Sequence, residues 1–140
     1  MTPQQIELVR TSFAQVAPIA GPAAKLFYSR LFELDPSLRP LFKSDLEEQG
    51  NKLMTMIGGV VDMLDQPDKL LPLAQNLGRR HAAYGVEDSH YETVGAALLW
   101  TLEKGLGTAF TLEVEQAWAA AYGLLSTTMR TAASEMFAAA

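Results

Sequence analysis

The chain has 140 residues, 49% of them hydrophobic, which is enough for one packed domain spanning residues 1–140. Lysine and arginine total 11 against 16 aspartate and glutamate, and the net charge of −5 argues against nucleic acid and membrane partners. No apolar run is long enough to cross a bilayer, and the N-terminus has no signal-peptide pattern. The absence of cysteine excludes disulfides, iron–sulfur clusters and thiolate zinc sites, so we expect a cytoplasmic protein.

Helical periodicity begins directly at the N-terminus. Thr2, Pro3 and Gln5 form a typical helix start, in which side chains cap free backbone N–H groups. Pro18 and the pair Gly21–Pro22 end this helix and begin another. The second helix carries apolar residues at helical spacing, with Tyr28 at the border of their face: Ala23, Leu26, Phe27, Leu31 and Leu34.

A corner over residues 35–42 contains two prolines and ends with Leu41 and Phe42, which we expect to face inward. A capping box at residues 44–47 then predicts a further helix start. One face of this helix carries Gln49, Leu53, Met56, Ile57 and Val60. Its glycine pair, Gly58–Gly59, would let another backbone come close.

The next helix begins at Pro67 and leads to His81. Residues four apart lie on one helix face, so His81 shares the inward stripe of Leu70, Leu73, Ala74 and Leu77. The helix stops at Tyr84–Gly85. A buried imidazole must form a hydrogen bond or bind a metal. Taken alone, His81 is therefore either a core histidine bonded to a backbone carbonyl or a metal ligand.

Two further helices complete the chain. A Ser-x-x-Glu cap at residues 89–92 predicts a helix with Tyr91, Val94, Leu98 and Leu102 on its inner face, ended by Gly105 and Gly107. A long helix then runs from Thr111 to about Phe137, with a stripe of Trp118, Tyr122, Leu125 and Met129. No segment alternates as a strand does, so we expect an all-α fold of six to eight helices.

The order and spacing of Tyr28, Phe42, Gln49 and His81 resemble those of a globin. The finer resemblance is to bacterial single-domain globins and the haem domains of flavohaemoglobins, and it covers nearly the whole chain. Their Tyr-x-x-Val-Gly is similar to residues 91–95, and their Ala-Trp-x-x-Ala-Tyr-Gly is similar to residues 117–123. The resemblance implies a three-on-three helical sandwich around haem b.

The resemblance also implies roles for individual residues. His81 would be the proximal ligand of the haem iron, with the Leu77 carbonyl or Tyr91 as partner of its second ring nitrogen. Tyr28 and Gln49 would donate hydrogen bonds to bound oxygen. The other expected haem contacts line the pocket or reach its propionate edge: Phe42, Lys52, Leu53, Leu77, Arg80, Tyr84, Val86 and Tyr91.

These roles predict a protein that binds oxygen reversibly, and also carbon monoxide and nitric oxide, for storage, transport, scavenging or sensing. The alternative is a nitric oxide dioxygenase or peroxidase-like enzyme with an external reductase, because we expect no flavin or nicotinamide domain. A cofactor-free helical interaction module would leave the spacing of these residues unexplained. Ala133 occupies the position of a glutamate that flavohaemoglobins hold near the proximal histidine, which argues for binding over turnover.

Overall fold

The computed structural model describes residues 1–42 and 45–138, of which 136–138 are described by their backbone alone. This part of the chain contains six α-helices and no strand, as predicted. The α-helices are α1 (Pro3–Val16), α2 (Ala20–Leu34), α3 (Leu46–Asp62), α4 (Pro67–Ala83), α5 (Asp88–Leu106) and α6 (Leu112–Ala138). Short 3-10 turns lie at η1 (Ala17–Ile19), η2 (Pro36–Leu41) and η3 (Gly107–Ala109). None of the described helices is both long and apolar enough to cross a membrane.

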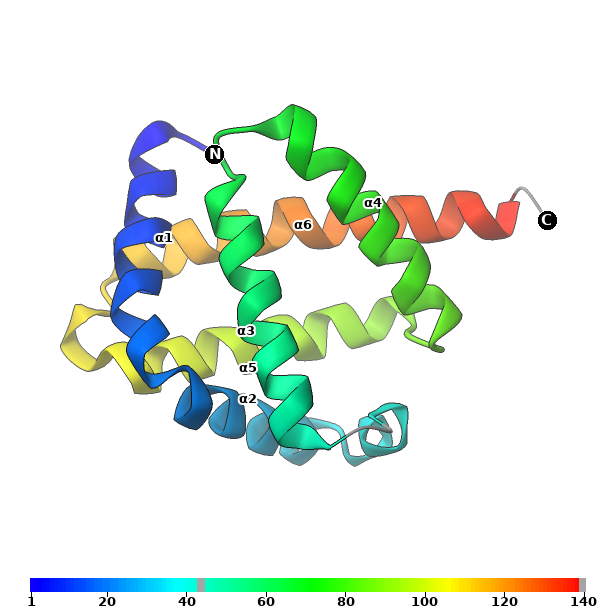
Figure 1. Cartoon of the computed structure of the whole chain (residues 1–140), viewed down its shortest axis with the longest axis horizontal. Coiled ribbons are helices and arrows are strands. Elements are labelled where there is room, and N and C mark those ends of the chain that lie inside the picture. Colours follow the sequence, from blue (N-terminus) through cyan, green and yellow to red (C-terminus); the bar gives the residue numbers. More distant parts are fainter. Residues whose placement is uncertain (43–44, 139–140) are drawn as a thin grey trace.

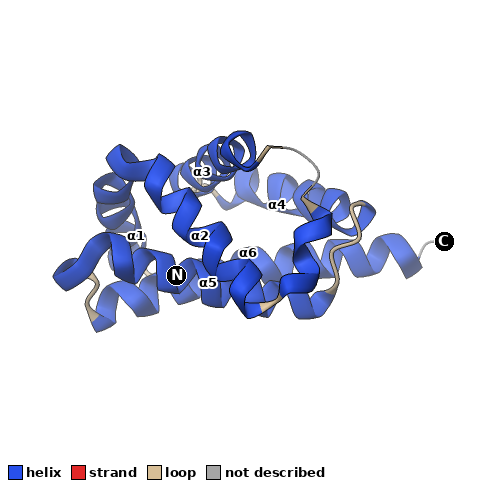
Figure 2. Ribbon diagram, turned by 90° about the horizontal axis from the view of Figure 1, so that it is seen from below, coloured by secondary structure: helices blue, strands red, loops and turns tan. Residues whose placement is uncertain are grey.

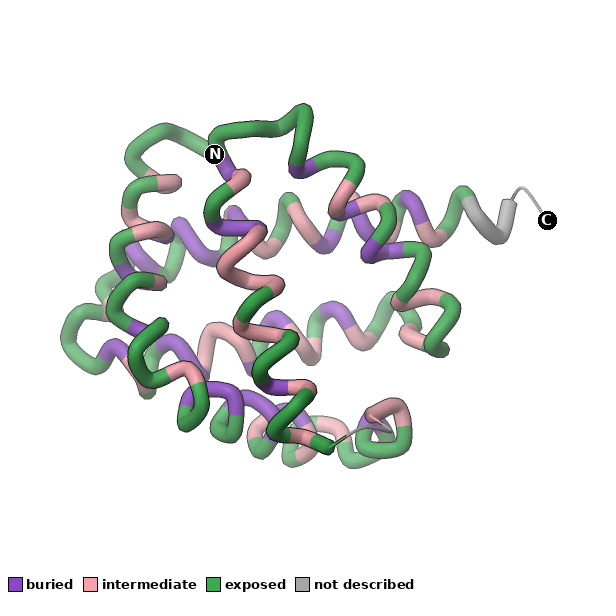
Figure 3. Tube along the Cα trace, in the orientation of Figure 1, coloured by how far each residue is buried: buried purple, intermediate pink, exposed green. Residues whose placement is uncertain are grey.

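The helices form two crossing layers. Figure 1 shows α1, α3 and α4 running across α2, α5 and α6, and Figure 2 shows the two layers edge-on. The most extensive packing joins α4 to α6, α2 to α5 and α3, and α1 to α6. Buried positions follow the inward faces of both layers (Figure 3). A sandwich of this kind places α3 and α4 at one side of the molecule, with α5 and α6 behind them.

The start of α1 agrees with the sequence prediction, whereas the start of α5 differs from it. Thr2 and Gln5 form the predicted capping box of α1, with hydrogen bonds of 3.1 and 3.0 Å. The box predicted at 44–47 includes Ser44, which lies outside the described residues. The cap predicted at Ser89 is wrong, because α5 already begins at Asp88 behind Glu87. The Glu87 N–H donates instead to Nδ1 of His90 at 3.0 Å.

The inward face of α2 differs from the predicted one. Leu26 and Leu34 are 38% and 42% exposed, whereas Tyr28 is only 5% exposed. Ala23, Phe27 and Leu31 are buried as expected. The buried stripe is therefore rotated toward Tyr28, which lies inside the protein and not at the border of the apolar face.

Close backbone approach occurs at a glycine other than the predicted pair. Gly58 faces the Phe13 ring at ordinary contact distance, and nothing lies within 4 Å of a Cβ added at Gly59. At Gly78, by contrast, an added Cβ would overlap the backbone of Met129. Gly78 thus lets α4 and α6 touch backbone to backbone, three residues before His81.

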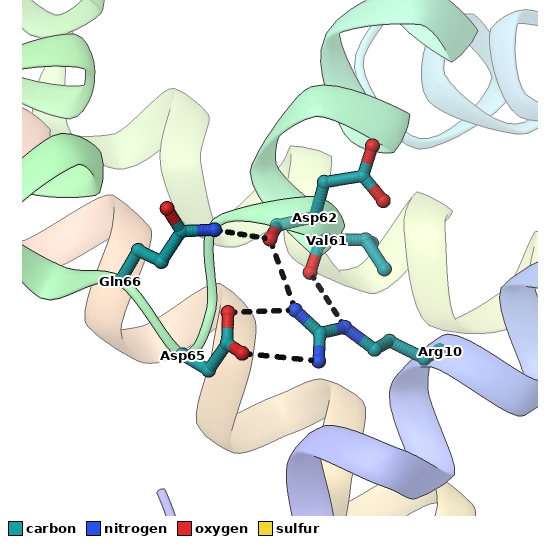
Figure 4. Close-up of polar contacts among 5 residues, drawn as sticks. All are labelled: Arg10, Val61, Asp62, Asp65 and Gln66. Atoms are coloured by element: carbon teal, nitrogen blue, oxygen red, sulfur yellow. Dashed lines mark hydrogen bonds and ion pairs between the residues drawn. The ribbon is translucent and has the colours of Figure 1, made fainter.

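An arginine from α1 holds the end of α3 (Figure 4). Arg10 donates from Nη2 to the Asp62 carbonyl at 2.9 Å and from Nε to the Val61 carbonyl at 3.4 Å. Its guanidinium also pairs with the Asp65 carboxylate at 2.8 Å, which holds the pKa of that carboxyl below its usual range. The last carbonyls of a helix have no intrahelical donor, so Arg10 acts as a cap supplied by another helix.

Candidate functional site

His81 lies near the end of α4, half-buried on the same face as the buried Leu77 and Ala74. Its Nδ1 is 2.7 Å from the carbonyl oxygen of Leu77, the acceptor expected one turn earlier. In a neutral imidazole, an N–H at Nδ1 that donates to this carbonyl leaves Nε2 as the ring's electron-pair donor. The ring is therefore oriented by the backbone and presents its second nitrogen as a free electron-pair donor, which is the form that binds a metal.

The chain turns back directly after His81. The N–H groups of Tyr84 and Val86 both donate to the His81 carbonyl, at 3.1 and 3.0 Å, and Gly85 has a φ of +93°. Glycine adopts this left-handed conformation without strain. The turn brings Val86 against the buried cluster of Ala74, Leu77, Tyr91 and Met129. The chain segments before and after His81 therefore pack against the same cluster.

Tyr28 lies in a second buried cluster formed by α2, η2 and α5. Its ring packs edge-on against Phe27 at 5.2 Å and Phe42 at 5.3 Å between centroids. Burial raises the pKa of Tyr28 to about 12, so its hydroxyl stays protonated at neutral pH. That hydroxyl has no hydrogen-bond partner among the described residues. A protonated phenol in this apolar setting can donate a hydrogen bond to a small ligand.

Gln49 and Leu53 lie one turn apart on α3, and both are half-buried. The residue after Gln49 explains how α3 reaches the tyrosine. A Cβ added at Gly50 would lie 2.8 Å from Cβ of Ala24 and 4.0 Å from the Tyr28 ring. Gly50 therefore allows α3 to cross α2 closely beside Tyr28, a role that the sequence prediction did not assign to it. Leu53 and Phe42 both pack against the Tyr28 cluster.

The residues predicted at the outer edge of the pocket are exposed. Lys52 and Arg80 are open to solvent, and Tyr84 is 67% exposed. Neither Lys52 nor Arg80 forms an ion pair within the described parts of the chain. Their position suits an anionic group at the surface, and their contact with propionates stays a prediction.

Tyr91 is tied to α6 by residues that the sequence prediction missed. Its carbonyl accepts a hydrogen bond from the Tyr122 hydroxyl at 2.5 Å. The Arg130 guanidinium lies over the Tyr91 ring, 5.7 Å from its centroid, and is 3.7 Å from the Asp88 carboxylate. Burial raises the pKa of Tyr91, an effect that Asp88 increases and Arg130 reduces. The alternative bond between Tyr91 and His81 is absent from the hydrogen bonds of the described residues, and His81 uses the Leu77 carbonyl.

An open hollow of about 430 Å³ lies behind Tyr91. Half-buried Ala133 faces it from α6, at the position where the resembled flavohaemoglobins carry glutamate. The wall also includes two acidic residues, Glu87 directly before α5 and Asp88 at its first position. The lining residues are Ala82, Gly85, Val86, Glu87, Asp88, Tyr91, Ala133 and Ser134.

These side chains fit a flat apolar group with a metal at its centre. His81 offers its second ring nitrogen from α4, and Tyr28 offers from α2 a hydroxyl that has no hydrogen-bond partner among the described residues. Half-buried apolar side chains pack against both clusters: Phe42, Leu53, Val94 and Leu98 against the Tyr28 cluster, and Leu73 and Val86 against the cluster of Leu77 and Tyr91. A layered helical fold that carries an imidazole on an inward helix face is typical of the helical proteins that hold haem between their helices.

Comparison with known proteins gives the family. The Globin family model matches residues 25–129, so this chain belongs to the globin family. Globins bind haem and, at its iron, oxygen and similar diatomic gases. The predicted family, fold and gas-binding function are thereby confirmed.

Relatives of two kinds are similar to the chain. Neuroglobin of Tetraodon nigroviridis is 34% identical over 137 residues, covering 88% of this chain and 86% of that protein. The flavohemoprotein of Bordetella parapertussis is 31% identical over 129 residues, covering 90% of this chain but only 32% of the relative. Among solved structures, an engineered carbene transferase, itself a candidate nitric oxide dioxygenase from Rhodothermus marinus, superposes with a TM-score of 0.88. That structure is 27% identical and the match covers 99% of this chain and 97% of the other.

Proposed function

We propose that this globin binds haem b with His81 as the proximal iron ligand, and that it binds oxygen reversibly with Tyr28 and Gln49 as distal hydrogen-bond donors. The observation that carries the proposal is the pairing of two features. The His81 ring is oriented by the Leu77 carbonyl with Nε2 left free, and the Tyr28 hydroxyl is protonated without a partner among the described residues. When bound, haem supplies a ferrous iron that takes up diatomic gases.

On the proximal side, the chain fixes the direction of the imidazole. The Leu77 carbonyl selects the Nδ1–H tautomer, and the packing of Leu77 and Val86 around Tyr91 limits rotation of the helix end. A neutral backbone acceptor adds little negative charge to the ring compared with a carboxylate. His81 would therefore be a ligand of ordinary globin strength.

On the distal side, the residues donate hydrogen bonds and keep water out. The Tyr28 hydroxyl and the Gln49 amide are both donors, whereas Leu53 and Phe42 offer only apolar surface. Oxygen on a ferrous iron carries partial negative charge and gains from such donors. Each hydrogen bond contributes about 1 kcal/mol net, so two together would slow oxygen dissociation by roughly 30-fold.

The remaining haem contacts belong to the same proposal. Leu77, Val86 and Tyr91 would pack on the proximal face, and Phe42 and Leu53 on the distal face. Lys52, Arg80 and Tyr84 are exposed beyond them, where long side chains would reach the propionates. Slow dissociation gives high oxygen affinity, which suits scavenging or sensing better than bulk delivery. We place the protein in the cytoplasm, in line with a sequence that contains no cysteine.

An enzymatic role is the second candidate, favoured by the similarity to a flavohemoprotein and to a candidate nitric oxide dioxygenase. Nitric oxide dioxygenation by this chain would need electrons from an external reductase. Steady-state consumption of nitric oxide with a generic flavin reductase and nicotinamide would separate this role from simple binding. Turnover that stops after one equivalent would favour the binding role.

Absorption spectra of the purified protein test the main proposal. After reconstitution with haem b, the oxidised, reduced and carbon monoxide forms should give the bands of a histidine-ligated b-type haem. The reduced protein should also take up oxygen and release it under vacuum. Failure to bind one equivalent of haem b, or a spectrum unchanged by carbon monoxide, would contradict the proposal.

A further inference from the structure

The proximal side of the site rests on α6 through two neighbouring residues. The Met129 backbone lies against Gly78, directly after Leu77, and its side chain is buried in the same cluster as Leu77 and Tyr91. Arg130 follows Met129 and lies over the Tyr91 ring. One turn of α6 therefore contacts both the helix that carries His81 and the helix that carries Tyr91.

Arg130 makes two contacts here, and its contact with the Tyr91 ring is stronger than its ion pair with Asp88. The Asp88 carboxylate is 3.7 Å from Arg130 and 76% exposed, so the ion pair is long and screened by water. Tyr91, by contrast, is only 8% exposed as a residue, and a guanidinium over an aromatic face attracts more strongly where the ring is desolvated. Arg130 thus lies over a ring that belongs to the same buried cluster as Leu77.

Tyr91 also borders an open space that gives it little support. The hollow of about 430 Å³ lies beside its ring, and the small side chains of Ala133 and Ser134 face that space. The Tyr91 hydroxyl makes no hydrogen bond with the described residues, and the bond from Tyr122 reaches its backbone carbonyl and not its ring. The orientation of the Tyr91 ring therefore depends on packing contacts, including the one with Arg130.

We infer that Arg130 is a positioning residue for the proximal histidine: it holds the Tyr91 ring against the cluster of Leu77, and the Leu77 carbonyl in turn orients His81. The inference rests on the proposed role of His81 as iron ligand. The path is Arg130 to Tyr91 by stacking, Tyr91 to Leu77 by packing, and Leu77 to His81 by the 2.7 Å hydrogen bond. The planar guanidinium matters as well as its charge.

The test compares Arg130→Met with Arg130→Lys and with a matched control, Arg10→Met. The Arg10 and Arg130 side chains are 32% and 37% exposed, and each pairs with one aspartate. Arg10, however, holds the end of α3 (Figure 4), and its partners there do not belong to the cluster of Leu77 and Tyr91. Two measurements are made on each haem-reconstituted protein: amide hydrogen exchange of the segment 84–91, and the iron–histidine stretching band of the reduced form by resonance Raman.

Arg130→Met should speed exchange of the segment 84–91 by roughly 2- to 30-fold, the range that a cation–π contact of this kind contributes. It should also shift or broaden the iron–histidine band. Arg130→Lys should lie between Arg130→Met and the wild type in both measurements, and Arg10→Met should match the wild type in both. Exchange that rises without any change of the band would overturn the inference, because Arg130 would then only stabilise the fold. Equal effects of Arg130→Met and Arg10→Met would overturn it too.

The two proposals fail in distinguishable ways. A wild-type protein that binds no haem contradicts the proposed function, and with it the inference about His81, whatever Arg130 does. Normal haem spectra in the wild type together with an unmoved band in Arg130→Met contradict only the role of Arg130.

Discussion

The backbone of Met129 on α6 lies so close to Gly78 on α4 that a methyl group at Gly78 would come within 2.6 Å of the Met129 Cα atom. Backbone atoms cannot move aside as the end of a side chain can. The contact sets the distance between α4 and α6 and hence the depth at which His81 sits, one turn further along α4.

Gly78→Ala should therefore destabilise the protein by about 1–3 kcal/mol, the usual cost of overpacking, and should loosen haem binding as α4 moves. Gly59→Ala is the matched control, because it also adds a methyl group inside a helix but meets nothing within 4 Å. It should stabilise the protein by about 0.5–1 kcal/mol through helix propensity. Denaturant unfolding of both variants checks the pair, and a Gly78→Ala protein as stable as the wild type would contradict the contact.

His81→Gly should produce a protein that loses its haem or binds it weakly, because no other imidazole replaces it. Added imidazole should restore the ligand and the spectrum. His90→Ala is the control and should leave the spectrum unaltered, since the His90 Nδ1 only accepts a hydrogen bond from the Glu87 N–H at the start of α5. If His90→Ala loses the haem absorption and His81→Gly keeps it, the proximal ligand is assigned to the wrong helix.

Tyr28→Phe and Gln49→Leu should each speed oxygen dissociation, by about 5-fold for the loss of a 1 kcal/mol hydrogen bond. Carbon monoxide should respond much less, because it carries less negative charge on its outer atom when bound. The double variant should depart from additivity, since both donors address one ligand. Stopped-flow mixing measures all four proteins, and equal effects on both gases would indicate a steric role instead.

Strongly alkaline pH should weaken the fold through Tyr28. Burial raises the pKa of its phenol from the ordinary value of 10.0 to about 12, so between these values the unfolded chain loses its proton first. The folded state then binds more protons than the unfolded one, and stability falls as the pH rises through this window. Tyr28→Phe should lose less stability between pH 10 and pH 12 in denaturant unfolding. Tyr84→Phe, which removes a hydroxyl from a side chain 67% exposed, is the control, and equal behaviour of the two variants would contradict the argument.

The parts of this molecule that follow from local periodicity were predictable. The inward stripe of α4, the stop at Gly85 and the spacing of Tyr28, Phe42, Gln49 and His81 depend on residues close in sequence or on their order. The inward face of α2 was placed wrongly, because Leu26 and Tyr28 lie on opposite flanks of the stripe that carries Phe27, and only packing against α3 decides which flank is buried. That packing depends on Gly50 and Ala24, from two different helices.

Contacts between distant segments were not predictable. Nothing in the pattern around Arg130 indicates that it lies over Tyr91, because the contact joins α5 and α6 through their tertiary packing. The same holds for the Trp118 indole, which donates to the buried Ser12 hydroxyl at 2.8 Å. The glycine pair Gly58–Gly59 suggested a close approach, whereas the crossing occurs at a single glycine, Gly78, that a periodicity argument treats as a weak point of a helix.

The strength of the proximal ligand gives the last prediction. Half-buried Ala133 lines the hollow beside Tyr91, where the resembled flavohaemoglobins carry a glutamate. An alanine cannot accept a proton, so the His81 imidazole is left with the neutral Leu77 carbonyl as its acceptor. The iron–histidine stretching band of the reduced protein should therefore lie in the oxygen-carrier range.

Ala133→Glu should raise this frequency, because the hollow of about 430 Å³ has room for a carboxylate beside Tyr91. The nearby Glu87 and Asp88 would raise the pKa of the new carboxyl, so the effect should grow as the pH increases from 5 to 8. Ala132→Ser, a change one position round the helix at a buried residue, is the control for a general disturbance of α6. A wild-type frequency already in the peroxidase range would mean that Glu87 or Asp88 reaches the proximal side. Enzymatic turnover would then be the better account of this globin.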